Sequence, residues 1–164
     1  MLILTWNCQG IGRTLKSQAL GELLRKNHPS IVFLMESKNN KAKMEAICCK
    51  LRFDYGSYVE LEGLLGGLVL WWNKEVNLVV EVAKRNFMHV AVTECSKPAR
   101  WEATFVYGCP SRAGRGKVWD EIKSLAQDVR LPRLCMGDFN QILSVGINME
   151  VMLPHRNLCW PSMN

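Results

Sequence analysis

Short apolar runs alternate with helix-spaced apolar stripes along most of the chain. Runs flanked by polar or turn residues read as strands buried on both faces, and they lie at residues 2–4, 31–34, 68–71 and 134–136. Stripes with apolar residues three and four positions apart predict helices, and they lie at residues 15–24, 44–51 and 118–129. The chain therefore carries both strand and helix signals, interleaved.

The stretch from residue 75 to 107 has a different pattern. Segments 76–82, 89–93 and 101–107 are rich in β-branched residues and are separated by turn residues, which predicts an antiparallel meander. Strand–helix units followed by a meander, another helix and another strand favour an α+β layered sandwich. Residues 145–164 lose this pattern, so we expect one domain over residues 1–144 and a divergent tail after it.

Composition and charge restrict the class of protein. Hydrophobic residues make up 48% and charged residues 22%, which is typical of a globular domain. No apolar run approaches the roughly 18 residues that cross a bilayer, and the N-terminus lacks the features of a signal peptide. We therefore expect an intracellular protein, with the nucleus as one option, and no membrane partner.

The net charge of +6 arises in the first third of the chain. Residues 1–52 hold nine Lys or Arg against three Asp or Glu, and the remainder is balanced. This excess favours a polyanionic partner such as DNA, bound through its phosphate backbone. A solvated basic helix face explains the same charge equally well.

Polar side chains stand at the ends of three of the predicted strands. Asn7 follows residues 2–6, Glu36 follows residues 31–35, and Asp138 follows residues 134–136. Singly, each has an ordinary explanation as a turn residue or the first solvated residue. Together they indicate a site, because the carboxyl ends of strands in an open α/β sheet line the ligand crevice. A carboxylate such as Glu36 is a candidate Mg²⁺ ligand, Asp138 can accept a proton or bind a metal, and Asn140 can donate to a phosphate oxygen.

Five short motifs carry a resemblance to a known family. In chain order they are Trp6–Gly10, Phe33–Glu36, Gly66–Trp71, Tyr107–Pro110 and Gly137–Asn140. The order and separations resemble those of the endonuclease/exonuclease/phosphatase family, and most of all the apurinic-type endonuclease domain of plant non-LTR (LINE) retrotransposons, over residues 1–144. The resemblance implies a four-layer α/β sandwich of two packed sheets that cleaves phosphate esters with Mg²⁺ or Mn²⁺.

The resemblance also implies a role for each matched residue. Glu36 resembles the metal-binding glutamate and Asn7 its companion at the end of the neighbouring strand. Asp138 resembles the aspartate that orients or deprotonates the attacking water, and Asn140 its phosphate-contacting neighbour. Tyr107 resembles the tyrosine that reaches the scissile phosphate.

Two features depart from the family pattern. Gln9 stands where relatives of the repair-enzyme type have an aspartate. After Ser144 we find no match to the later Asn, Asp and Asp-His residues of the family, and the context of His155 does not replace them.

The basic segment 111–117 does not fit a phosphate-binding loop, which leaves a DNA-backbone contact or the solvated first turn of a helix.

Two functions follow from the sequence. The first is a C-terminally truncated, Mg²⁺-dependent, DNA-nicking endonuclease of retrotransposon origin, impaired by the truncation. The second is a catalytically inactive remnant that at most binds nucleic acid.

Overall fold

The computed structural model describes residues 1–12, 14–60, 67–95, 97–125 and 131–141. His155, the tail at 145–164 and the proposed domain boundary after residue 144 lie outside these residues. None of the helices in the described ranges is long and apolar enough to cross a membrane.

In the part of the chain that the structure describes, the first sheet contains four strands in the order β1-β2-β4-β3. Their bounds are Ile3–Asn7 for β1, Ile31–Met35 for β2, Tyr55–Val59 for β3 and Leu68–Trp72 for β4. β1 and β2 are parallel, whereas β4 runs antiparallel to both of its neighbours. β3 was not predicted, because its sequence has no apolar run.

The second sheet has the order β5-β6-β7-β8. Its strands are Val76–Lys84 for β5, Phe87–Glu94 for β6, Lys97–Tyr107 for β7 and Arg133–Asp138 for β8. The first three form the predicted antiparallel meander, and β8 adds to β7 in parallel. Both sheets are therefore mixed, and each contains one parallel pair.

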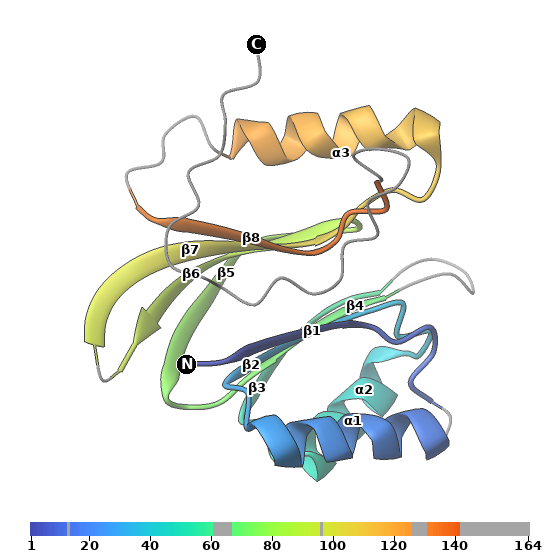
Figure 1. Cartoon of the computed structure of the whole chain (residues 1–164), viewed down its shortest axis with the longest axis vertical. Coiled ribbons are helices and arrows are strands. Elements are labelled where there is room, and N and C mark those ends of the chain that lie inside the picture. Colours follow the sequence, from blue (N-terminus) through green and yellow to red (C-terminus); the bar gives the residue numbers. More distant parts are fainter. Residues whose placement is uncertain (13, 61–66, 96, 126–130, 142–164) are drawn as a thin grey trace.

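Helices cover the outer face of each sheet (Figure 1). α1 (Thr14–Asn27) and α2 (Lys41–Lys50) lie on the first sheet, and α3 (Arg112–Ser124) lies on the second. All three stripes thus form helices, although α3 ends before the predicted residue 129. The basic segment 111–117 is the N-cap and first turns of α3, since the Ser111 hydroxyl accepts a hydrogen bond from the Gly114 N–H at 3.3 Å.

The main core lies between the two sheets. β2 is buried along its whole length, and Phe33 packs on Phe105 across the interface with ring centroids 5.2 Å apart. β4 is buried except at its last residue. The prediction of strands buried on both faces is wrong for β1 and β8, which are only partly buried because each is an edge of its sheet in the described part of the chain.

Gly137 lets β8 lie against β7 at the end of the second sheet. Its φ is +145°, and an added Cβ would collide with the carbonyl oxygen of Val106 on β7. A side chain at this position would separate the two strands beside the Tyr107–Asp138 pair. We therefore expect Gly137 to be required for the local backbone.

Gly137→Ala should lower the free energy of unfolding by more than about 1 kcal/mol, because it combines an unfavourable φ with a backbone collision. Gly116→Ala is the matched control, since a Cβ there meets no atom within 4 Å on helix α3. It should raise the free energy of unfolding by about 0.5–1 kcal/mol. Urea denaturation measures both, and a Gly137→Ala protein as stable as the wild type would contradict the proposed backbone constraint.

Candidate active site

Four strands from the two sheets end at one place. Asn7 is the last residue of β1, and Glu36 follows β2; Tyr107 ends β7, and Asp138 ends β8. The parallel registers pair Asn7 with Met35 in the first sheet and Tyr107 with Asp138 in the second. The packing of the two sheets therefore brings together the carboxyl ends of two parallel pairs.

Hydrogen bonds join these side chains into one network. Nδ2 of Asn7 donates to Oε1 of Glu36 and to Oδ2 of Asp138, each at 3.0 Å. The Tyr107 hydroxyl donates to the same Oε1 of Glu36 at 2.9 Å. Four of the five predicted site residues are thus in direct contact, and two of the three bonds cross from one sheet to the other.

The network affects the protonation of Glu36 and Tyr107. Burial alone would raise the pKa of Glu36, but the hydrogen bonds from Asn7 and Tyr107 and the nearby Lys38 ammonium lower it below its ordinary value. Burial, together with the hydrogen bond to Glu36 and the negative charges of Glu36 and Asp138, raises the pKa of Tyr107 to about 12. Near neutral pH the site therefore contains a Glu36 carboxylate beside a neutral phenol.

Asn140 lies next to this network in a tight turn. Its backbone N–H donates to Oδ1 of Asp138 at 2.9 Å, and its side-chain Nδ2 donates to the Gly108 carbonyl at 2.7 Å. The turn thus fixes the Asp138 carboxylate from the side opposite Asn7. An Asn amide has two N–H groups, so binding Gly108 leaves one of them available as a donor.

Lys38 is a site residue that the sequence reasoning missed. Its Nζ lies 3.5 Å from Oε2 of Glu36, the carboxylate oxygen that Asn7 and Tyr107 do not bind. Glu36 and Lys38 both have positive φ angles, 53° and 51°, and so does Gln9 at 44°. Such backbone conformations are unfavourable for non-glycine residues and concentrate at functional sites. The signal in the sequence that could have identified Lys38 was its position two residues after Glu36, the predicted metal ligand.

The donor atoms fit a hard divalent cation. Among the described residues there is no group of three or more His, Cys, Asp and Glu side chains suited to a metal. Mg²⁺ does not require such a group, because it binds through one or two carboxylates and takes further oxygens from water and substrate phosphate. Oδ1 of Asn7 is buried without a hydrogen-bond partner, and the Glu36 carboxylate is charged. These two oxygen donors suit Mg²⁺ or Mn²⁺.

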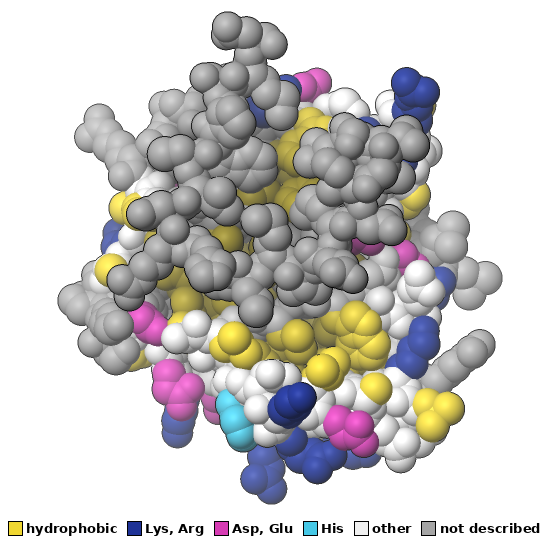
Figure 2. All heavy atoms as spheres, viewed as in Figure 1, with side chains coloured by type: hydrophobic (Ala, Val, Ile, Leu, Met, Phe, Trp, Pro, Cys, Tyr) yellow, Lys and Arg dark blue, Asp and Glu magenta, His cyan; other side chains and the backbone are white. Residues whose placement is uncertain are grey.

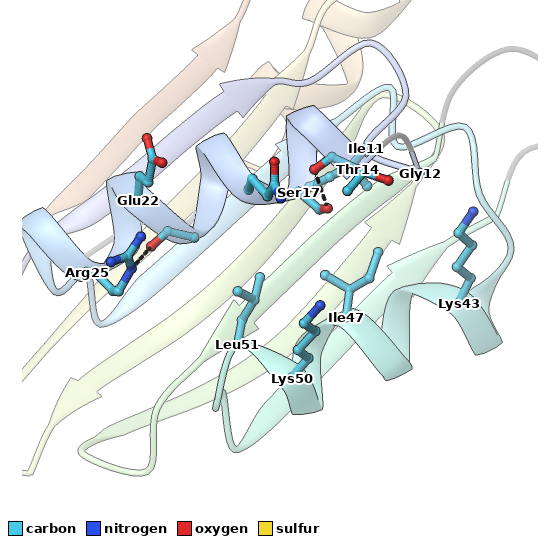
Figure 3. Close-up of a pocket in the computed structure, with 12 residues that line it drawn as sticks. Ile11, Gly12, Thr14, Ser17, Glu22, Arg25, Lys43, Ile47, Lys50 and Leu51 are labelled. Atoms are coloured by element: carbon cyan, nitrogen blue, oxygen red, sulfur yellow. Dashed lines mark hydrogen bonds between the residues drawn. The ribbon is translucent and has the colours of Figure 1, made fainter.

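A cavity of about 670 Å³ lies elsewhere, between α1 and α2 (Figure 3). It is lined by Arg25, Lys43 and Lys50 and by none of the residues of the hydrogen-bonded network. Lys and Arg side chains also gather along the edge of the molecule over these helices (Figure 2). The basic first third of the chain is therefore divided, with Lys38 at the network and several other cations on the helical layer.

Comparison with known families and structures identifies the fold. A model of the endonuclease/exonuclease/phosphatase family matches residues 4–145. The chain belongs to this family. Its members generally use a divalent metal, which agrees with the oxygen donors of Asn7 and Glu36. The comparison with curated proteins found no match.

Solved structures of the endonuclease/exonuclease/phosphatase fold resemble the chain at low sequence identity. The human Nocturnin catalytic domain with bound sulfate is 14% identical with a TM-score of 0.59, over 84% of this chain and 62% of that one. The 3′ phosphatase NExo from Neisseria bound to product DNA hairpin is 18% identical with a TM-score of 0.57, over 84% and 57%. TDP2 from D. rerio complexed with single-strand DNA product is 15% identical with a TM-score of 0.59, over 85% and 60%. The chain spans about three fifths of the length of these structures, and the likeness shows the fold.

Tyr107→Phe should raise the pKa of Glu36, because it removes one of the hydrogen bonds that lower it. Carbon-13 NMR of the labelled glutamate carboxyls measures the titration directly. Tyr55→Phe is the control, since Tyr55 is half-exposed on β3 and should leave the titration unchanged. An identical Glu36 titration in Tyr107→Phe and wild-type protein would contradict the network.

The lowered pKa of Glu36 also makes the stability of the fold depend on pH. Because this pKa is lower in the folded state than in the unfolded chain, Glu36 makes its full contribution to the free energy of unfolding above the ordinary Glu pKa. That contribution is lost as the pH falls through the folded-state pKa.

Proposed function

We propose that this chain is a phosphodiesterase domain that nicks DNA with Mg²⁺ or Mn²⁺. The observation that carries the proposal is one hydrogen-bonded cluster, in which Asn7 binds Glu36 and Asp138, and Tyr107 binds Glu36. The first sheet supplies Asn7 and Glu36, and the second sheet supplies Tyr107 and Asp138. A charged carboxylate, a second acid and a phenol at the ends of parallel strands can supply a metal ligand, a base and a phosphate contact for phosphate-ester hydrolysis.

Each residue has a distinct role in this proposal. Glu36 and Oδ1 of Asn7 would hold the ion, which when bound offsets negative charge on phosphate oxygens. Asp138 orients the attacking water and takes its proton, since its carboxylate is held from two sides by Asn7 and Asn140. When substrate binds, the single O–H of Tyr107 turns from Glu36 to the scissile phosphate, and the second N–H of Asn140 donates to a phosphate oxygen.

DNA is the substrate best supported. Two of the similar structures contain DNA products, and the chain's motifs resemble those of retrotransposon endonucleases more than those of lipid phosphatases in the same family. Lys38, beside Glu36, supplies positive charge for the phosphate backbone. The proposed retrotransposon origin rests on the motif resemblance alone.

A second candidate is a domain that binds nucleic acid without cleaving it. No histidine of the described ranges takes part in the hydrogen bonds of the network. A missing general acid or phosphate donor can lower a rate by orders of magnitude while leaving binding intact.

Asp138→Asn should lower the rate of nicking of supercoiled plasmid in Mg²⁺ by roughly 10²- to 10⁴-fold, because the amide cannot accept the proton. Asp120→Asn is the matched control on an exposed position of α3 and should nick at the wild-type rate. Agarose gels of relaxed and supercoiled plasmid give the rates, and fluorescence anisotropy gives binding to a labelled duplex. Equal nicking by Asp138→Asn and wild type would refute the assigned role. Binding without nicking in either metal would select the second candidate.

A further inference from the structure

Trp119 on helix α3 contacts the turn that carries Asp138 and Asn140 on both sides of Asn140. The indole of Trp119 stacks on the ring of Phe139, with centroids 5.6 Å apart and planes 10° apart. Its Nε1 donates to Oε1 of Gln141 at 2.8 Å. Trp119 therefore holds the residues immediately before and after Asn140.

The turn has a conformation on which two polar contacts depend. Asn140 has a φ of 50°, in the left-handed region that asparagine adopts more readily than most other non-glycine residues. In that conformation its N–H reaches the Asp138 carboxylate and its amide reaches Gly108. Relaxation of the turn would move both polar groups at once.

The opposite side of the turn is fixed by the end of β7. The Gly108 N–H donates to the Asp138 carbonyl at 2.7 Å, and a Cβ on Gly108 would collide with the Phe139 carbonyl. The backbone of the turn thus lies directly against Gly108, while the Phe139 ring faces α3. Trp119 contacts the turn from α3 by a ring stack with Phe139 and by a hydrogen bond to Gln141.

We propose that Trp119 is a positioning residue, whose indole keeps Asp138 and Asn140 in the geometry that the reaction requires. The inference rests on the proposed function for its catalytic consequence, although the positioning itself is a property of the fold. Trp119 is only partly buried and packs, with Phe139, at the margin of the core beneath α3, whose buried residues on the helix are Val118 and Ile122. A variant at Val118 therefore tests packing of the helix separately from the contact of Trp119 with the turn.

Trp119→Leu should lower kcat for nicking of an oligonucleotide duplex by about 10- to 100-fold and change KM less than about threefold, because a small displacement of aligned groups acts on the chemical step. Trp119→Phe, which retains a ring for stacking but no N–H, should recover most of the lost kcat. Val118→Ala is the control for packing, because Val118 is the neighbouring buried residue on the helix. This variant should lower the melting temperature and leave kcat unchanged.

Hydrogen exchange tests the positioning without any activity. The Gly108 N–H binds the backbone carbonyl of Asp138, and the Asn140 N–H binds its carboxylate. In Trp119→Leu both N–H groups should exchange with solvent at least about tenfold faster, with no change in the first sheet. Gln141→Ala removes the exposed acceptor of the indole N–H and should give a smaller increase at Asn140; it decides the question if Trp119→Leu does not fold.

The outcomes are separable. Unchanged exchange at Gly108 and Asn140 in both variants would overturn the role of Trp119, and so would a kcat loss equal to that of Val118→Ala. Absence of nicking by the wild-type protein would overturn the proposed function while the exchange result still decides the positioning.

Discussion

One side-chain amide joins the two sheets at the place where their parallel strands end. Asn7 Nδ2 donates both to Glu36 in its own sheet and to Asp138 in the other, and these two acceptors are far apart in the chain. The apolar core between the sheets brings β1 and β8 near each other. The directional bonds of Asn7, with that of Tyr107 to Glu36, then join the strand ends of the two sheets.

The arrangement of charge follows from these bonds. Glu36 accepts from Asn7 and Tyr107 on one oxygen and lies near Lys38 on the other, so its carboxylate is stabilised while partly buried. The arrangement also contains unfavourable features, since Asn7 Oδ1 is buried without a partner and Glu36 has a left-handed backbone. An unpaired buried oxygen is destabilising in a resting fold and useful in one that binds a cation.

Local sequence patterns predicted the elements and the polar residues at strand ends. Apolar runs and β-branched segments identified β2, β4 and the meander, and Asn7, Glu36 and Asp138 were identified because each ends such a run. β3 was missed because Tyr55–Val59 has no apolar run and is a strand through its pairing with β4.

The contacts of the site were less accessible to sequence reasoning. Asn7 and Asp138 are 131 residues apart, and their proximity depends on how two sheets pack. Trp119 lies next to Val118 in the predicted helical segment, and only the structure shows that it contacts the turn after β8. The half-buried state of β1 and β8 likewise depends on strand order, which no local pattern encodes.

A double-mutant cycle between Asn7→Ala and Asp138→Ala tests most directly whether the site joins the two sheets. The free energies of unfolding of the wild type, both single variants and the double variant, measured in urea at neutral pH, give the coupling energy. A hydrogen bond to a charged, partly buried acceptor predicts a coupling of about 1 kcal/mol or more. Additivity within about 0.3–0.5 kcal/mol would show that the two residues act independently and would contradict the account.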